Sequence, residues 1–245
     1  PDLEPHLRAL VRRELLAPVA DPERPEHGQY AFVQALIREV AYNTLAKRDR
    51  KRRHLAAAHY FEGLGTDELA GALAGQYLAA HRNAPAGPEA DALAAQARVA
   101  LRAAAERAAS LGSHAQAVAF LEQALGVTTD PAEQARLLEA AGRSASLAAD
   151  HAAAERYLER ATEIQRGLGD RPAAARTIAA LGAALIHGSR SDRALALLEP
   201  SATEFADLAG DPGAVALDSQ LARALMVGQQ HQRAVEVSDR ALAAA

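Results

Sequence analysis

The sequence predicts an all-α fold: a right-handed solenoid of helical hairpins, preceded by a shorter N-terminal segment with one short β-hairpin. Composition is the first observation, because 49% of the 245 residues are apolar but only 4% are aromatic. Most of the apolar residues are alanine, which is the best helix former and packs closely. The second observation is a regular spacing of small residues in the second half. The third is that proline and glycine clusters recur between helical segments.

The second half of the chain repeats one helical-hairpin unit four times. The second helix of each unit is expected to begin at His114, His151, Ser191 and His231, which are roughly 40 residues apart. A small residue precedes each start and an alanine follows it, always at the same spacing: Ala105 and Ala117, Gly142 and Ala154, Gly182 and Ala194, Ala222 and Ala234. A fixed spacing of small residues indicates two helices that cross closely. The period indicates a solenoid.

These units resemble the tetratricopeptide repeat. The resemblance also rests on large apolar residues and on further small residues at fixed positions: Leu101, Leu138, Ile178, Leu121, Leu158, Leu198, Ala124, Ala161, Ser201 and Ala241. Two features depart from the family. Asp218 stands at an apolar anchor position of the last unit, and the period exceeds the usual ~34 residues. The surplus is expected to lengthen the end of one helix and the start of the next.

The N-terminal segment is expected to begin with a helix that runs to about Arg13. Strands over 14–19 and 29–33 would close a hairpin whose tip, 21–28, is rich in proline and turn residues. Helices are then expected over 35–45 and 51–61.

A second resemblance covers Tyr30 to Tyr42, Leu45, Arg52 to His54 and Ala57. This stretch is similar to the winged-helix domain of bacterial STAND signalling ATPases, of the kind fused to class III adenylate/guanylate cyclases. The resemblance implies a partial winged-helix domain over 1–62 and an ATPase core upstream in the same protein as a partner. It implies ATP and Mg²⁺ for that parent protein only, and no cofactor for this chain.

Gln34 stands where many members of that family carry a histidine that approaches the β-phosphate of the bound nucleotide. The resemblance therefore implies a weak, nucleotide-proximal role for Gln34. The alternative is that Gln34 only caps the helix that follows it.

Residues 63–110 are expected to form a divergent helical pair that leads into the first repeat. Its helices would run from Thr66 to Arg82 and from Asp91 to Ser110, with Pro88 at the start of the second. Residues 111–245 would form the repeats, in an array truncated at its C-terminus. Pro200 falls inside a predicted helix and is expected to bend it.

The sequence contains no pattern that indicates catalysis. It has no cysteine, and its lysines, Lys47 and Lys51, do not follow a glycine-rich phosphate loop. No metal-ligand pattern occurs, and His114, His151 and His231 are expected at exposed turns. No apolar run is long enough for a membrane span. The chain is therefore predicted to be cytoplasmic and not itself an enzyme.

The first helices of the repeats are expected to line a concave groove that is rich in arginine. The candidate groove residues are Arg102, Arg136, Glu139, Arg143, Arg176, His187, Ser219 and Arg223. Because the planar guanidinium suits carboxylates, the groove predicts a protein or peptide partner of acidic character. The alternative is an ordinary solvated helix face. Arg160 and Arg240, on second helices, are expected to face outward.

Two classes of function fit these observations. The first is a non-catalytic interaction or sensor module of a larger signalling ATPase, which binds a protein segment or effector in the groove. The second is a DNA-binding transcriptional regulator that uses the winged helix, with the repeats as a dimerisation or effector arm. The basic run from Lys47 to Arg53 could contact phosphates, but no aromatic platform or second basic patch accompanies it. Nucleic acid is therefore the less favoured partner.

Overall fold

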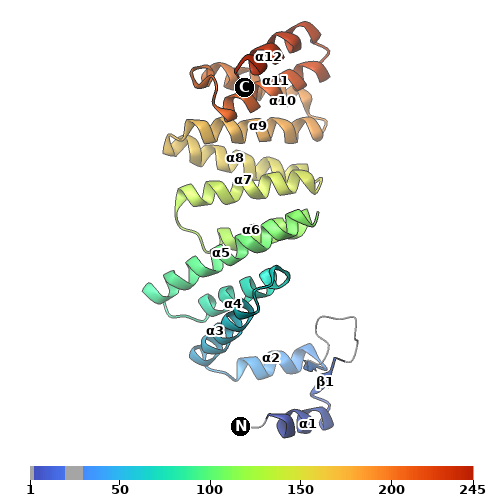
Figure 1. The fold of residues 1–245 in the computed structure, drawn as a ribbon, viewed down its shortest axis with the longest axis vertical. Helices are drawn as coiled ribbons and strands as arrows, with labels where there is room; N and C mark the ends of the chain where they lie inside the picture. The colour runs from blue at the N-terminus through green and yellow to red at the C-terminus, as the bar shows by residue number, and fades with distance from the viewer. Residues whose placement is uncertain (1–2, 20–29, 245) are drawn as a thin grey trace.

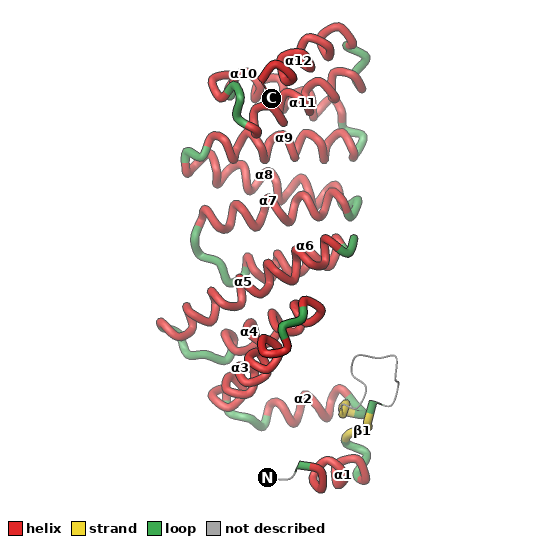
Figure 2. Tube along the Cα trace, viewed as in Figure 1, coloured by secondary structure: helices red, strands yellow, loops and turns green. Residues whose placement is uncertain are grey.

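The computed structural model describes residues 3–19 and 30–244. In this part of the chain the helices stack one above another into an elongated array, with the two termini at opposite ends (Figure 1). The predicted hairpin tip, 21–28, lies outside the described residues. The remainder is almost entirely helical, as Figure 2 shows by secondary structure. The predicted all-α solenoid with one short β-hairpin is therefore confirmed.

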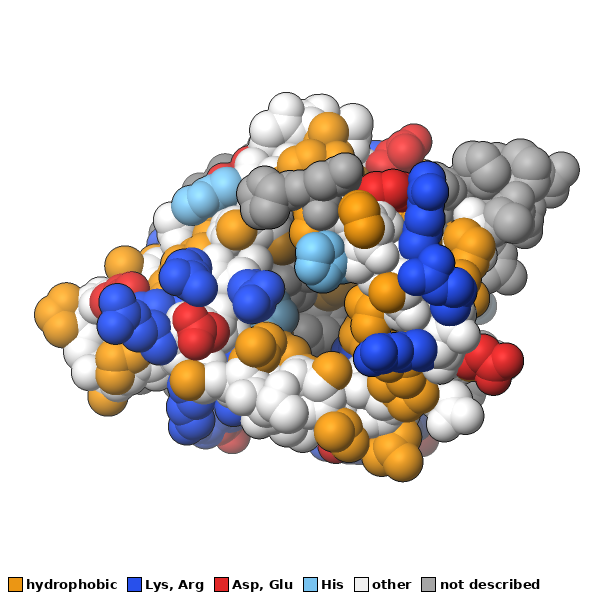
Figure 3. All heavy atoms as spheres, turned by 90° about the horizontal axis from the view of Figure 1, so that it is seen from below, with side chains coloured by type: hydrophobic (Ala, Val, Ile, Leu, Met, Phe, Trp, Pro, Cys, Tyr) orange, Lys and Arg blue, Asp and Glu red, His pale blue; other side chains and the backbone are white. Residues whose placement is uncertain are grey.

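The N-terminal segment has the predicted order of elements. It consists of α1 (Glu4–Arg12), β1 (Leu16–Pro18), β2 (Tyr30–Phe32) and α2 (Ala35–Asn43). The two strands pair antiparallel, with Leu16 opposite Phe32. Leu16 is the one buried apolar side chain among the described residues of this segment, since neither helix buries a residue. Seen from this end, hydrophobic and basic side chains are intermixed on the surface (Figure 3).

Three helices follow this segment: α3 (Lys47–Leu64), α4 (Ala70–Arg82) and α5 (Pro88–Ser110), with a 3₁₀ turn, η1 (Asp67–Leu69), before α4. Pro88 occupies the first turn of α5, where its missing N–H costs nothing. α3 begins earlier than expected and takes in the basic run from Lys47. A chain of side-chain hydrogen bonds links α2 to α3 and α4: Asn83 donates to the Tyr42 hydroxyl, which contacts His54 Nε2, and His54 Nδ1 contacts Gln76.

The repeats consist of a first and a second helix each: α5 with α6 (His114–Leu125), α7 (Pro131–Leu147) with α8 (His151–Leu168), α9 (Arg171–His187) with α10 (Ser191–Glu204), and α11 (Pro212–Val227) with α12 (His231–Ala244). The predicted second-helix starts are confirmed at all four positions. Aspartates at 130, 150, 170 and 211 cap four of these helices through their side chains. No helix in the described residues is long and apolar enough to cross a membrane.

Each first helix ends in the same turn. Gly112, Ala149, Ser189 and Gln229 occupy equivalent positions and all have positive φ, between 58° and 75°. The next N–H in each turn bonds back to a helix carbonyl, as Asp150 does to Ala145 and Arg190 to Leu185. This is the Schellman pattern, which satisfies the last carbonyls of a helix. Ala149, Ser189 and Gln229 therefore adopt a left-handed conformation, which gives each first helix the same end.

The small residues lie where the paired helices cross. A Cβ added to Gly142 would lie 2.5 Å from Leu158 Cγ, and one added to Gly182 would lie 2.7 Å from a methyl of Leu198. The close partner of each glycine is therefore a leucine of the second helix, and Gly142 also faces the Ala154 carbonyl oxygen, 3.3 Å from the added Cβ. Alanines 117, 154, 194 and 234 are buried, as the repeat pattern requires.

The surplus length is used differently in successive units. α8 continues to Leu168, so that one helix is lengthened as expected. α10 instead ends at Glu204, and a 3₁₀ turn, η2 (Ala206–Leu208), follows. Arg171 holds this turn against the start of α9 through Asp207 and lies 5.6 Å from the centre of the Phe205 ring. α10 remains helical through Pro200.

Candidate functional site

The first helices α5, α7, α9 and α11 form one face of the array, which we call the inner face. Two of its arginines are joined to carboxylates of a neighbouring first helix. Arg102 of α5 reaches Glu133 of α7 at 3.1 Å, and Arg176 of α9 reaches Glu139 of α7 at 3.0 Å. These contacts form a charged stripe that links α5, α7 and α9.

Glu133 is the acidic centre of the N-terminal part of this stripe. Its N–H is held by the capping side chain of Asp130, which fixes the first turn of α7. The Glu133 carboxylate, whose side chain is 13% exposed, receives both Arg102 and Arg136. Sequence reasoning missed Glu133, although its place one helical turn before Arg136 is a signal that could have identified it. Two arginines thus share the Glu133 carboxylate, and Arg102 also lies 3.9 Å from the exposed carboxylate of Glu106.

Glu139 plays the same part in the next junction. Its side chain is only 5% exposed, and it accepts two hydrogen bonds from Arg176, at 3.0 and 3.1 Å. Arg143 approaches the same carboxylate at 3.6 Å. The hydrogen bond to Glu139, followed by its charge, raises the pKa of Arg176, so this guanidinium stays charged. Glu139 is therefore a neutralising and positioning group rather than a freely exposed groove residue.

The C-terminal part of the predicted site is less connected. Arg223 is exposed on α11, and no carboxylate among residues 3–19 and 30–244 lies within ion-pair distance of it. His187 ends α9; burial, followed by the charges of Arg223 and His151, lowers its pKa. The Ser219 hydroxyl donates to Val215 of its own helix. Arg223 and His187 therefore lie near each other, whereas Ser219 makes a local helix contact.

A cleft of about 260 Å³ opens on the inner face between α5 and α7. Its floor is apolar, from Leu121, Leu137 and small alanines, and Ser144 also lines it. Arg102, Glu106, Arg136 and Arg143 surround it. The structure thus brings three of the predicted groove arginines around one depression, with apolar surface between them.

Gln34 lies elsewhere, in the N-terminal segment. It holds the N-cap position of α2 with an extended backbone, but its side chain makes no capping hydrogen bond. The side chain is exposed. The nucleotide-proximal role implied by the resemblance stays a prediction.

The basic run at the start of α3 is partly engaged within the chain. Lys51 pairs with Glu89 at 2.6 Å, and Arg52 pairs with Asp49 at 3.1 Å. Arg50 lies 5.0 Å from the centre of the Tyr42 ring. Half of the six bases therefore have contacts inside the chain, which reduces the charge available for a polyanion.

Comparison with solved structures identifies the fold. A putative kinesin light chain of Podosopora anserina with nearly identical TPR-like repeats matches with a TM-score of 0.56 and 20% identity, over 81% of this chain and 95% of that one. A point variant of the same protein gives a TM-score of 0.57 and 20% identity, over 79% and 93%. BtubC (BKLC) from P. vanneervenii gives 0.51 and 16%, over 80% and 90%.

At these identities the likeness establishes a TPR-like helical repeat fold and no more. The predicted repeat architecture is thereby confirmed. No protein-family model matches the chain, and no curated protein matches it. The inner face, which contains the arginine–carboxylate pairs and the cleft, is the candidate site of this fold.

Proposed function

We propose that this chain is a non-catalytic interaction module whose inner face binds an acidic segment of a protein partner. The observation that supports this best is the ratio of charges on that face. Arg102, Arg136, Arg143 and Arg176 have three carboxylates within ion-pair distance: Glu133, Glu139 and the more exposed Glu106. The arginines are therefore positioned by acids that do not neutralise them all, and charged donors remain for a ligand.

The cleft between α5 and α7 adds an apolar contact to this charge. An extended acidic segment could place carboxylates on Arg136 and Arg143, whose side chains are 70% and 59% exposed. An apolar side chain of the segment could then occupy the floor formed by Leu121 and Leu137. Hydrogen bonds from the arginines to the carboxylates would orient the bound segment, and burial of its apolar side chain would add affinity.

We further propose that the module belongs to a larger cytoplasmic signalling ATPase and reports binding to it. The support is the resemblance of residues 30–57 to the winged-helix region of STAND ATPases. The N-terminal segment also exposes Phe32, Val33, Leu36 and Val40, which form an apolar surface that a neighbouring domain could cover.

The test is direct binding of short fluorescent peptides that differ in the number of glutamates and in one apolar residue. Arg136→Ala and Arg143→Ala should each weaken binding of the best peptide about tenfold or more, because hydrogen bonds to charged groups contribute roughly 1.5–3 kcal/mol. Both positions are exposed, so the melting temperature should hardly change.

Arg160→Ala is the matched control. Arg160 is an exposed arginine on α8 that pairs with Glu163 of its own helix at 2.9 Å. If this variant weakens peptide binding as much as the inner-face variants do, the attraction is nonspecific and the proposed site is wrong.

A further inference from the structure

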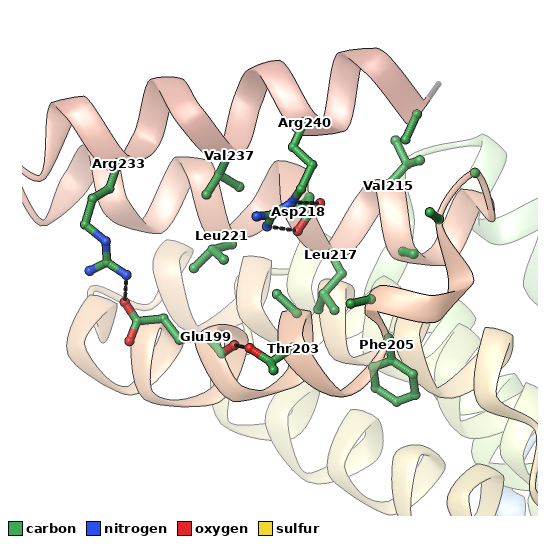
Figure 4. Close-up of a pocket in the computed structure, with 16 residues that line it drawn as sticks. Glu199, Thr203, Phe205, Val215, Leu217, Asp218, Leu221, Arg233, Val237 and Arg240 are labelled. Carbon is green, nitrogen blue, oxygen red and sulfur yellow. Dashed lines mark hydrogen bonds and ion pairs between the residues drawn. The ribbon is translucent and has the colours of Figure 1, made fainter.

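A cavity of about 430 Å³ lies at the C-terminal end of the array and is lined by residues of α10, α11, α12 and the segment that joins α10 to α11. The cavity lies between α10 and α12, with α11 beneath it (Figure 4). Phe205, Leu217, Leu221 and Val237 are buried and line it. None of the inner-face residues described above lines it. Its volume is within the range of small-molecule sites, roughly 300–1,000 Å³.

The cavity arises where the last two repeats meet. At Gly213, the start of α11 comes so close to α9 that an added Cβ would lie 2.7 Å from the Pro172 carbonyl oxygen and 3.0 Å from the Arg176 nitrogen. The space between α10 and α12 forms the cavity. α12 meets α10 at the edge of that space through Arg233 and Glu199, at 2.8 Å.

An ion pair unique to the fourth unit lies inside the cavity. Equivalent positions to Asp218 hold Leu101, Leu138 and Ile178. Asp218 is only 16% exposed and accepts two hydrogen bonds from Arg240, from Nε at 2.8 Å and from Nη2 at 2.6 Å. Replacing an apolar anchor by a half-buried ion pair seldom adds stability, so the exchange calls for another explanation.

The lining has two separated ion pairs with apolar surface between them. Figure 4 shows Leu221 and Val237 between the Arg233–Glu199 pair and the Arg240–Asp218 pair. The two arginines of the lining balance its two carboxylates. A ligand with a single charge would therefore be repelled by one member of each ion pair. Arg240 keeps N–H donors beyond its two bonds to Asp218, and the carboxylates keep lone pairs.

We propose that this cavity binds a free apolar α-amino acid. The ligand carboxylate would bond to Arg240 or Arg233, its ammonium group to Asp218 or Glu199, and its side chain would lie on the apolar floor. A carboxylic acid or an amine alone would satisfy only half of this lining. An uncharged apolar ligand would cover the ion pairs without bonding to them, which costs desolvation. The bound amino acid would bridge α10 and α12.

The test is isothermal titration calorimetry of this chain with leucine, isoleucine, valine and phenylalanine. At least one should bind saturably with a Kd of about 1 mM or tighter, as expected for a small ligand. N-acetyl-phenylalanine and phenylalanine amide each lack one charge and should bind about tenfold or more weakly than the free amino acid. Absence of saturable binding by all four amino acids up to roughly 10 mM would overturn the proposal, as would equal binding of the blocked compounds.

Two variants separate a binding role from a structural one. Asp218→Leu restores the apolar anchor of the other repeats, so the melting temperature should be kept or raised while binding is lost. Arg240→Leu should also abolish binding. Arg160→Leu changes the equivalent position of the second repeat and should leave binding intact. Undiminished binding in a folded Asp218→Leu protein would show that the ligand lies elsewhere.

Discussion

Tyr157 is the residue where the two halves of the hydrophobic core meet. One cluster of buried residues extends from Ala58 to Ala141 and another from Ala145 to Val237, and Tyr157 packs against both. Its hydroxyl donates to Glu122 of α6. Burial, followed by the hydrogen bond and the charge of Glu122, raises the pKa of Tyr157 to about 12. The neutral phenol is thus part of the folded state.

This gives a pH dependence whose sign is fixed. Because the folded-state pKa is above the ordinary value of 10.0, the contribution to stability is complete below pH 10 and is lost as the pH rises toward 12. Tyr157→Phe lacks the ionisable phenol and its pH-dependent contribution to stability. The urea midpoint of this variant should therefore fall less than that of the wild type between pH 9 and pH 11. Tyr60→Phe changes an exposed tyrosine and is the control. Parallel pH profiles for wild type and Tyr157→Phe would contradict this account.

At the scale of the helix pair, the crossing geometry depends on glycine at two positions. Gly142→Ala would place a Cβ against the branched carbon of Leu158, which is packed on all sides. We expect a loss of about 1–3 kcal/mol in the free energy of unfolding, the usual cost of overpacking. Gly167→Ala in α8 meets nothing within 4 Å and should instead stabilise by roughly 0.5–1 kcal/mol. Denaturant unfolding of both variants checks this, and similar effects in the two would rule out a tight crossing.

The helix pairs also show which structural features could be predicted from the sequence and which could not. Small residues at fixed spacing predicted the crossings because only steric contact demands such regularity. The three left-handed turns at Ala149, Ser189 and Gln229 could not be predicted, since the glycine that signals this conformation occurs only at Gly112. Asp218 was recognised as a departure, but Arg240 was expected to face outward. Its bond to Asp218 depends on the tilt between α11 and α12, which no local pattern encodes.

The same limit applies to the inner face. The repeat register predicted that Arg102, Arg136, Arg143 and Arg176 share one face, and three of them, Arg102, Arg136 and Arg143, line the cleft between α5 and α7. It did not reveal that Glu133 and Glu139 bridge neighbouring repeats, because such contacts depend on the rotation between units. The proline-rich turn signal at 21–28 and the short runs on either side of it predicted the hairpin of β1 and β2, while the nucleotide role of Gln34 stays a prediction.

Across the whole molecule, stability is concentrated in the stacked helices rather than in the N-terminal segment. Each repeat contacts its neighbours, so that stability is approximately a sum over units and their interfaces. The segment before α3 adds to this only Leu16 as a buried apolar side chain among its described residues. Its described side-chain hydrogen bonds to the helices beyond it are made by Tyr42, with His54 and Asn83.

A protein that lacks residues 1–46 should therefore keep its helices and melt within about 5 °C of the full chain, a shift that corresponds to roughly 1 kcal/mol or slightly more. A truncation of the same length from the other end, removing residues 200–245, takes away Leu217, Leu221 and Leu225, which belong to the core around α9. It also exposes the α9 surface that α11 covers, and each lost leucine should cost about 2–5 kcal/mol. Circular dichroism melts of the two truncated proteins compare these cases directly. If the N-terminal truncation proves the more damaging, the segment before α3 contributes to folding through contacts other than those of Leu16 and Tyr42.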